Sequence, residues 1–165
     1  SLKPLGLMPK RRTAILLNAP ALADIKDWPM VIDVDEQFYF KPDAGQILLS
    51  PADETPSRPC DAQPEELDIA IAMDRFLAVV DLDIKSINHS WAGLRTFAPD
   101  KTFVVGFDAN SKGFFWLAGQ GGYGVQSSPG MSQLARHLIL QSTLPSGYER
   151  IKASVEAVSP TRFSS

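Results

Sequence analysis

The segment GQGGYG at residues 119–124 holds the arrangement of residues most suggestive of chemistry. Gly119, Gly121 and Gly124 match the pattern G-x-G-x-x-G, which brings a backbone close to a pyrophosphate at the start of a helix. That fingerprint also requires a second parallel strand and an acidic residue roughly 20 positions later. Neither follows here, since no Asp or Glu occurs from residue 119 until Glu149. The spacing alone therefore does not predict a dinucleotide-binding fold.

Two interpretations of this glycine segment remain open from the residues themselves. Glycines let a backbone approach a flat or anionic ligand, and a following helix directs its unpaired N–H groups toward that ligand. The alternative is a tight turn between a strand and a helix, in which glycine is needed for a positive φ. Both interpretations place the segment between a strand and a helix.

Other residues that could do chemistry give weaker signals. The acidic run at residues 33–36 lacks the glycine and the later glutamate of a calcium loop, so we interpret it as a turn. His89 and His137 have no partner nearby in the sequence, and Cys60 is the single cysteine. Glu65 and Glu66 are typical of a helix N-terminus. We therefore predict no metal site, no internal disulfide and no hydrolytic triad.

Composition places the chain among folded, water-soluble domains. Its 165 residues are 44% hydrophobic and carry a net charge of −3, which argues against disorder and against a strongly cationic nucleic-acid binder. Its uncharged apolar runs are shorter than the ~18 residues that cross a bilayer, and residue 1 begins no secretion leader. The expectation is a cytoplasmic protein, with peripheral membrane association left open.

The elements that position these residues follow from local patterning. Three β-rich runs with tight polar connections predict an antiparallel meander in the first half, and a 3.6-residue apolar period predicts a helix. Strands are expected at residues 12–17, 28–32, 37–41, 46–50, 84–91, 103–106 and 114–118, and helices at 65–80 and 129–141, the second beginning at Ser127 or Ser128. Helices after a meander indicate an α+β fold.

Three motifs in order carry a specific resemblance. They are WAGLRTFAPDKTFVVG at residues 91–106, GFFWLAGQGGYGVQSSPG at 113–130 and SPTRF at 159–163. Together they resemble the carboxyl-terminal part of the flavin-dependent amine and amino-acid oxidoreductases related to D-amino acid oxidase. KRRTA, WPMVIDVDEQFYFKPDAG and PADETPS in the first half resemble the substrate domain of the same family. The match is closest to members that oxidise basic D-amino acids.

The resemblance implies a division of the chain and a missing part. Residues 1–92 would form a substrate-binding domain, an antiparallel mixed sheet with the helix at 65–80, and residues 93–165 a flavin-contacting segment with the last strand and helix of an FAD-binding domain. Family members carry a true dinucleotide fingerprint near their amino terminus, and this chain has none. We therefore expect a fragment that lacks the Rossmann half as its partner, does not retain FAD, is inactive alone and self-associates through the uncovered interface.

Two residues would hold the substrate carboxylate if the resemblance is followed. Arg95 would occupy the position of the arginine that lies over the flavin in this family. A planar guanidinium there can bind a carboxylate through two parallel hydrogen bonds. The hydroxyl of Tyr39 would make a further hydrogen bond to that carboxylate. An exposed surface arginine and a cross-strand aromatic are the alternatives for Arg95 and Tyr39.

The remaining site residues are also implied by the resemblance. Arg12 would lie at the edge of the active site, Met30 and Ile32 would line the side-chain pocket, and the Gly122 carbonyl would accept a hydrogen bond from the substrate amine. Core packing is the alternative for Met30 and Ile32. The expected flavin contacts are Arg95, Gly121, Gly122, Tyr123, Gly124, Val125 and Gln126.

The reaction implied is oxidative deamination. A hydride would pass from the substrate Cα to flavin N5, and water would hydrolyse the imino acid to a 2-oxo acid and ammonia. Basic D-amino acids are favoured as substrates, with glycine, sarcosine and proline as the alternatives. The sequence does not indicate whether the electron acceptor is oxygen or a quinone. The competing hypotheses are a non-enzymatic binding or interaction module, or one subunit of a split flavoenzyme.

Overall fold

The computed structural model describes residues 2–20, 24–143 and 152–163. The chain divides into two compact units. The first, called the sheet unit here, is Lys10–Leu94, and the second, called the carboxyl-terminal unit, comprises Ser1–Pro9 and Arg95–Ser165. The functional division at residues 92 and 93 stays a prediction. Each unit is described by itself.

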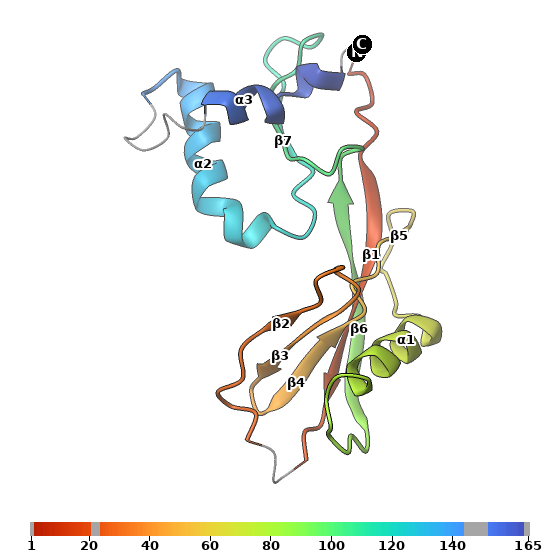
Figure 1. Cartoon of the computed structure of the whole chain (residues 1–165). Coiled ribbons are helices and arrows are strands. Elements are labelled where there is room, and N and C mark those ends of the chain that lie inside the picture. Colours follow the sequence, from red (N-terminus) through yellow and green to blue (C-terminus); the bar gives the residue numbers. More distant parts are fainter. Residues whose placement is uncertain (1, 21–23, 144–151, 164–165) are drawn as a thin grey trace. The chain divides into compact units, whose positions relative to one another are not determined.

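The sheet unit is built on an antiparallel sheet (Figure 1). Its strands are β1 (Met8–Leu17), β2 (Val31–Ile32), β3 (Tyr39–Asp43), β4 (Gln46–Ser50), β5 (Thr55–Pro56) and β6 (Ile87–Phe97). The order is β2-β3-β4-β1-β5, and β6 also pairs with β1. Strands β2, β3 and β4 form the predicted meander, in which Phe40 pairs with Val31 on one side and Leu49 on the other.

Some strand boundaries differ from those expected. The strand expected at residues 28–32 is only Val31–Ile32, which agrees with Pro29 having no N–H to donate to a neighbouring strand. The strand expected at 84–91 begins at Ile87 and continues to Phe97, and Arg95 lies near its end. Strand β1 likewise begins four residues earlier than expected, at Met8.

Helix α1 (Glu66–Leu77) covers one face of this sheet (Figure 1). Ala72 and Phe76 recur at helical spacing and are fully buried, as the apolar period predicts. The Phe76 ring meets the Phe40 ring edge to face, with 5.0 Å between the centroids. Ile15 and Leu49 complete the layer below the helix. Burial of this apolar layer fixes which face of each strand points toward α1.

The carboxyl-terminal unit combines a two-stranded sheet with two helices. Strands β7 (Val104–Phe107) and β8 (Phe115–Ala118) pair antiparallel, and they are followed by α2 (Gly124–Leu140), α3 (Lys152–Val158) and the 3-10 helix η2 (Pro160–Phe163). Val105 of β7 is buried with Leu134 of α2 and Val158 of α3. None of the helices in the described ranges has the length and apolar character needed to cross a bilayer.

Helix α2 begins at Gly124, so the predicted start beside Pro129 is wrong. A proline inside a helix cannot donate to the carbonyl four residues earlier, which here belongs to Val125. The hydroxyl of Ser128 donates to that carbonyl instead, at 2.9 Å. With this bond satisfied by a side chain, the helix continues back through Gly124, and Tyr123 is its N-cap residue.

Candidate functional site

The end of β6 lies beside the glycine segment in the carboxyl-terminal unit. Phe97 forms a β-bridge with Gln120, and the Gly121 N–H donates to the Thr96 carbonyl at 2.9 Å. These two contacts join the strand that carries Arg95 to the connection between β8 and α2. The sequence places the two segments more than 20 residues apart, and backbone hydrogen bonding brings them together.

Gly121 is required by both conformation and space. Its φ is 52°, in the left-handed region that side chains disfavour. A Cβ at this position would lie 2.6 Å from Phe97 Cε1, closer than any ordinary contact. Gly119 also has a positive φ, 73°. The turn interpretation of the motif therefore holds for these two glycines.

Gly122 leaves its side-chain position to the end of the Arg95 side chain. A Cβ at position 122 would lie 2.7 Å from Arg95 Nη1. The guanidinium is thus held against a bare stretch of backbone, where a side chain of any other residue would displace it. The ligand interpretation of the motif depends on this glycine.

Arg95 is half-buried and has no ion pair or hydrogen bond within the described part of the chain. Other arginines of the protein are paired: Arg11 with Asp68, Arg12 with Glu54 and Arg162 with Asp100. A guanidinium presents five donors, and those of Arg95 remain for an anion. Its planar fork suits a carboxylate.

The N-terminus of α2 adds positive polarisation to this unit. Tyr123 makes no side-chain cap, and the first turn contains no acidic residue. The first N–H groups of a helix have no intrahelical partners, and the helix dipole makes this end partially positive. Tyr123 and Val125 are exposed, and Gly122 and Gln126 beside them are exposed too. Arg95 therefore lies beside Gly122, at the start of an accessible and electropositive segment formed by residues 121–126.

The sheet unit carries the other predicted residues. Tyr39 of β3 pairs with Ile32 of β2 and with Ser50 of β4, so these three residues form one row across the sheet. Because side chains alternate along a strand, Tyr39 points away from the face on which Phe40 contacts α1. The row lies on the face of the sheet opposite α1. In the described residues the Tyr39 hydroxyl makes no hydrogen bond.

Met30 and Ile32 are not core residues. Their exposed fractions are 51% and 58%, which removes core packing as the reason for their apolar character. Arg12 is different, because its guanidinium lies 3.5 Å from Glu54 and only 13% of its side chain is exposed. Its Nε is buried without a hydrogen-bond partner among the described residues. Arg12 is held by Glu54, a contact that its sequence neighbourhood does not indicate.

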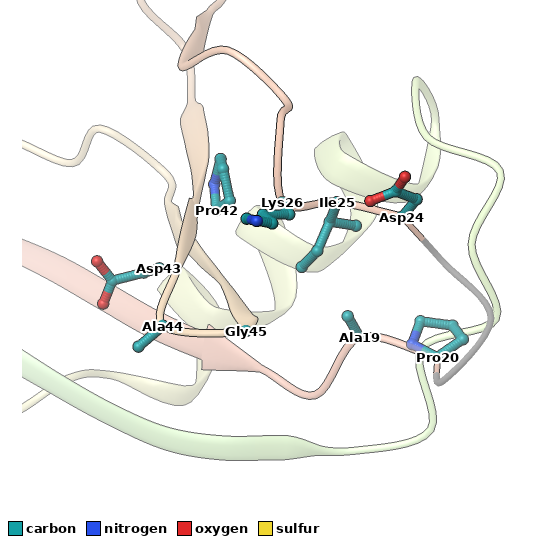
Figure 2. Close-up of a pocket in the computed structure, with 9 residues that line it drawn as sticks. All are labelled: Ala19, Pro20, Asp24, Ile25, Lys26, Pro42, Asp43, Ala44 and Gly45. Carbon is teal, nitrogen blue, oxygen red and sulfur yellow. The ribbon is translucent and has the colours of Figure 1, made fainter.

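A separate pocket of the sheet unit contains none of the predicted residues. Figure 2 shows it between the segment after β1 and the turn that joins β3 to β4. Its lining is Ala19, Pro20, Asp24, Ile25, Lys26, Pro42, Asp43, Ala44 and Gly45. In Figure 2 the carboxylates of Asp24 and Asp43 lie on opposite sides of this pocket, so they do not converge on one point.

The structure therefore groups the predicted residues into two sets. Arg95 and residues 121–126 come together in the carboxyl-terminal unit, while Arg12, Ile32 and Tyr39 belong to the sheet unit. Sequence reasoning missed Thr96 and Phe97, which hold Gly121 in place. No local signal identifies them, because the phenylalanine ring fills a space that only a distant glycine leaves open. No cluster of metal-binding side chains occurs in the described ranges.

Comparison with solved structures finds the same fold in several enzymes. The chain is similar to L-proline dehydrogenase from P. horikoshii, with a TM-score of 0.73 and 22% identity over 98% of this chain and 41% of that one. It is similar to glycine oxidase from Geobacillus kaustophilus (TM-score 0.69, 18% identity, 89% and 39% coverage). It is also similar to fructosamine oxidase from Aspergillus fumigatus (TM-score 0.70, 16% identity, 95% and 40% coverage).

The chain covers a similar share of each of these solved structures. The chain spans about 40% of the length of the solved structures that it matches. Residues 1–138 also match the family model described as FAD dependent oxidoreductase. This match covers most of the 165 residues, including the sheet, Arg95 and the glycine segment. The chain therefore belongs to the FAD-dependent oxidoreductase family.

Proposed function

We propose that this chain supplies the substrate-binding sheet and the flavin-contacting end of an FAD-dependent dehydrogenase or oxidase that deaminates D-amino acids, with basic ones favoured. The observation that carries the proposal is the Arg95 guanidinium, held on the Gly122 backbone without a partner among the described residues. The preference for basic substrates rests on the sequence resemblance of residues 91–106 and 113–130 to D-arginine dehydrogenase.

The carboxyl-terminal unit fits part of a flavin on its own geometry. Gly121 and Gly122 leave their side-chain positions to Phe97 and Arg95, so no Cβ projects from this stretch of backbone. The first N–H groups of α2 have no side-chain cap and favour a polar, electron-rich ring edge. Residues 121–126 and Arg95 would hold the cofactor there. Bound FAD would supply the acceptor for the hydride from the substrate Cα.

Arg95 has the role of orienting the substrate. Its fork would bind the α-carboxylate through two parallel charge-assisted hydrogen bonds, which fixes the direction of the Cα–H bond. The Gly122 carbonyl would accept a hydrogen bond from the substrate amine. The partially positive end of α2 would stabilise negative charge that develops beside it. Water then hydrolyses the imino acid to a 2-oxo acid and ammonia.

The sheet unit would contribute recognition of the substrate. We assign a hydrogen bond to the substrate carboxylate to the free hydroxyl of Tyr39. Met30 and Ile32, both exposed, would contact the substrate side chain. Arg12 would lie at the edge of the site, with its charge already balanced by Glu54. These assignments follow the family resemblance, and two of the residues, Ile32 and Tyr39, lie on the face opposite α1.

The proposal includes a partner. Because this chain spans about 40% of the enzymes that it matches, the rest of the FAD site would come from an FAD-binding half outside these residues. We expect the 165-residue chain alone to be inactive, not to retain FAD, and to self-associate through exposed apolar residues of its carboxyl-terminal unit. These include Phe107, Leu117, Tyr123 and Val125. The proposed location is the cytoplasm or the surface of a membrane.

The test uses the native polypeptide in which these residues occur. Purified protein is mixed anaerobically with D-arginine, D-lysine, glycine, sarcosine or proline, and loss of the oxidised-flavin absorbance is followed. We expect bleaching with basic D-amino acids, and a fall in kcat/KM of about 100-fold or more for Arg95→Gln, as expected when bidentate binding is lost. Arg136→Gln is the matched control, because Arg136 is an exposed residue of α2 that donates a hydrogen bond to Ser142. A flavin that no D-amino acid reduces would overturn the proposal, as would full activity of Arg95→Gln.

A further inference from the structure

The guanidinium of Arg162 in η2 donates four hydrogen bonds within the carboxyl-terminal unit. Its Nε donates to Asp100 Oδ2 at 2.7 Å, and its Nη2 donates to Asp100 Oδ1 at 3.1 Å. Nη2 also donates to the Thr102 carbonyl at 3.0 Å, and Nη1 donates to the Ser159 carbonyl at 2.8 Å. The guanidinium lies 4.2 Å from the centroid of the Phe163 ring. One planar group thus ties the turn of Asp100 and Thr102 to the segment of Ser159.

The backbone that carries Arg162 is itself fixed on β7. Pro160 is buried, and Gly106 of β7 leaves room for it. A Cβ on Gly106 would lie 2.9 Å from Pro160 Cδ, and the Gly106 φ of 148° also favours glycine. The Ser159 hydroxyl accepts a hydrogen bond from the Thr161 N–H and holds the first turn of η2. The backbone from which the Arg162 side chain extends to Asp100 is therefore fixed by packing and hydrogen bonding.

Asp100 lies in the turn that directly follows β6. The Lys101 N–H donates to the Ala98 carbonyl at 2.9 Å, and the Thr102 N–H donates to Asp100 Oδ1 at 3.0 Å. Ala98 is buried against the start of the glycine segment, where a Cβ on Gly119 would lie 3.5 Å from the Ala98 nitrogen. The turn that Arg162 binds directly follows β6, the strand that carries Arg95. It also packs on the glycine segment that contains Gly122.

We propose that Arg162 is a positioning residue, which acts through Asp100 to hold Arg95 and Gly121 in register. The bridge from Phe97 to Gln120 and the hydrogen bond from Gly121 to Thr96 anchor one side of the Arg95 segment. Arg162 anchors the turn on its other side. A lysine at position 162 can reach one acceptor but cannot form the fork, so Arg162→Lys should loosen this register although it keeps the charge.

The first test measures hydrogen exchange in the 165-residue chain and needs no flavin. We expect the Gly121 amide to exchange about tenfold faster in Arg162→Lys and in Asp100→Asn, as for loss of a charge-assisted hydrogen bond. The amides of residues 134–138 in α2 are the reference within the same unit, and their exchange should change less than twofold. Arg136→Lys is the control variant. Equal acceleration at Gly121 and in α2 would show that Arg162 only adds stability, and unchanged exchange at Gly121 would equally overturn the inference.

The second test concerns catalysis and rests on the proposed function. In the native polypeptide, Arg162→Lys should lower kcat/KM for the amino acid about tenfold, with most of the change in KM, because the carboxylate-binding residue is misplaced. A wild-type protein that oxidises no amino acid would overturn the proposed function and leave the exchange result standing. An active wild type, with normal KM in Arg162→Lys, would overturn the positioning role alone.

Discussion

The Arg95 guanidinium occupies the space next to Gly122 where a side chain would begin: a Cβ on residue 122 would lie 2.7 Å from Arg95 Nη1. The neighbouring Gly121 has a different constraint, because its φ is 52° and the Phe97 ring occupies its side-chain position. Two adjacent glycines are thus required for separate reasons. Substitutions can separate the effect on the arginine from the effect on the fold.

Gly122→Ala should impair the proposed substrate binding with little loss of stability. The added methyl meets the far end of a flexible side chain, which can move away at small cost, but Arg95 then leaves its position. We expect KM of the native polypeptide to rise about tenfold and the unfolding free energy to change by less than about 1 kcal/mol. Gly93→Ala is the control, since nothing lies within 4 Å of a Cβ at that position. Wild-type kinetics in Gly122→Ala would contradict the role given to Arg95.

Gly121→Ala should destabilise the carboxyl-terminal unit. It combines a positive φ with a Cβ placed 2.6 Å from an aromatic carbon of Phe97. We expect a loss of about 2–4 kcal/mol in urea unfolding. Gly113→Ala isolates the conformational part, because Gly113 has a φ of 82° and open space around its Cβ, and should cost about 1–2 kcal/mol. Equal losses of unfolding free energy in the two variants would show that the Phe97 ring moves aside at little cost.

Arg11 should be a major source of stability in the sheet unit. It pairs with Glu65 and Asp68, the latter at 2.7 Å, and only 12% of its side chain is exposed. Its Nε lies 3.7 Å from Asp53, whose side chain is 7% exposed. Hydrogen bonding to Glu65 raises the pKa of the guanidinium further. Arg11→Ala leaves these carboxylates without their cation and should cost about 2–4 kcal/mol in urea unfolding.

The control for Arg11→Ala is a solvent-exposed ion pair of the same unit. Lys85 pairs with Asp83, and both side chains are more than 70% exposed. Lys85→Ala should therefore change the unfolding free energy by less than about 0.5 kcal/mol. A similar small effect for Arg11→Ala would mean that solvent replaces its contacts.

The ion pair of Asp100 and Arg162 predicts a pH dependence of stability. Hydrogen bonding from Arg162 lowers the pKa of the Asp100 carboxyl below its ordinary value of 3.8. A carboxyl with a lowered folded pKa stabilises the fold above its unfolded pKa, and this contribution is lost as the pH falls through the folded pKa. The unfolding free energy of the wild type should exceed that of Asp100→Asn near pH 6, and the difference should shrink below about pH 4. Parallel profiles for the two proteins would contradict this assignment.

Local patterns anticipated much of the architecture. Alternating apolar residues indicate strands because one sheet face is buried, and β4 was predicted with the bounds that the structure shows, Gln46–Ser50. The 3.6-residue period indicates α1, whose observed end at Leu77 lies three residues before the predicted one. The glycine segment was placed between a strand and a helix, where it lies. These predictions depend only on residues that are close together in the sequence.

The sequence by itself determined the types and order of most elements and, through its motifs, the family, but β5, α3 and η2 were not predicted. The tertiary structure alone decided which residues meet. Arg162 binds Asp100 across 62 positions. The contact of Arg95 with Gly122 is of the same kind, since it depends on how β6 packs against the loop before α2. Contacts between distant residues depend on packing and space, and no local pattern of residues encodes them.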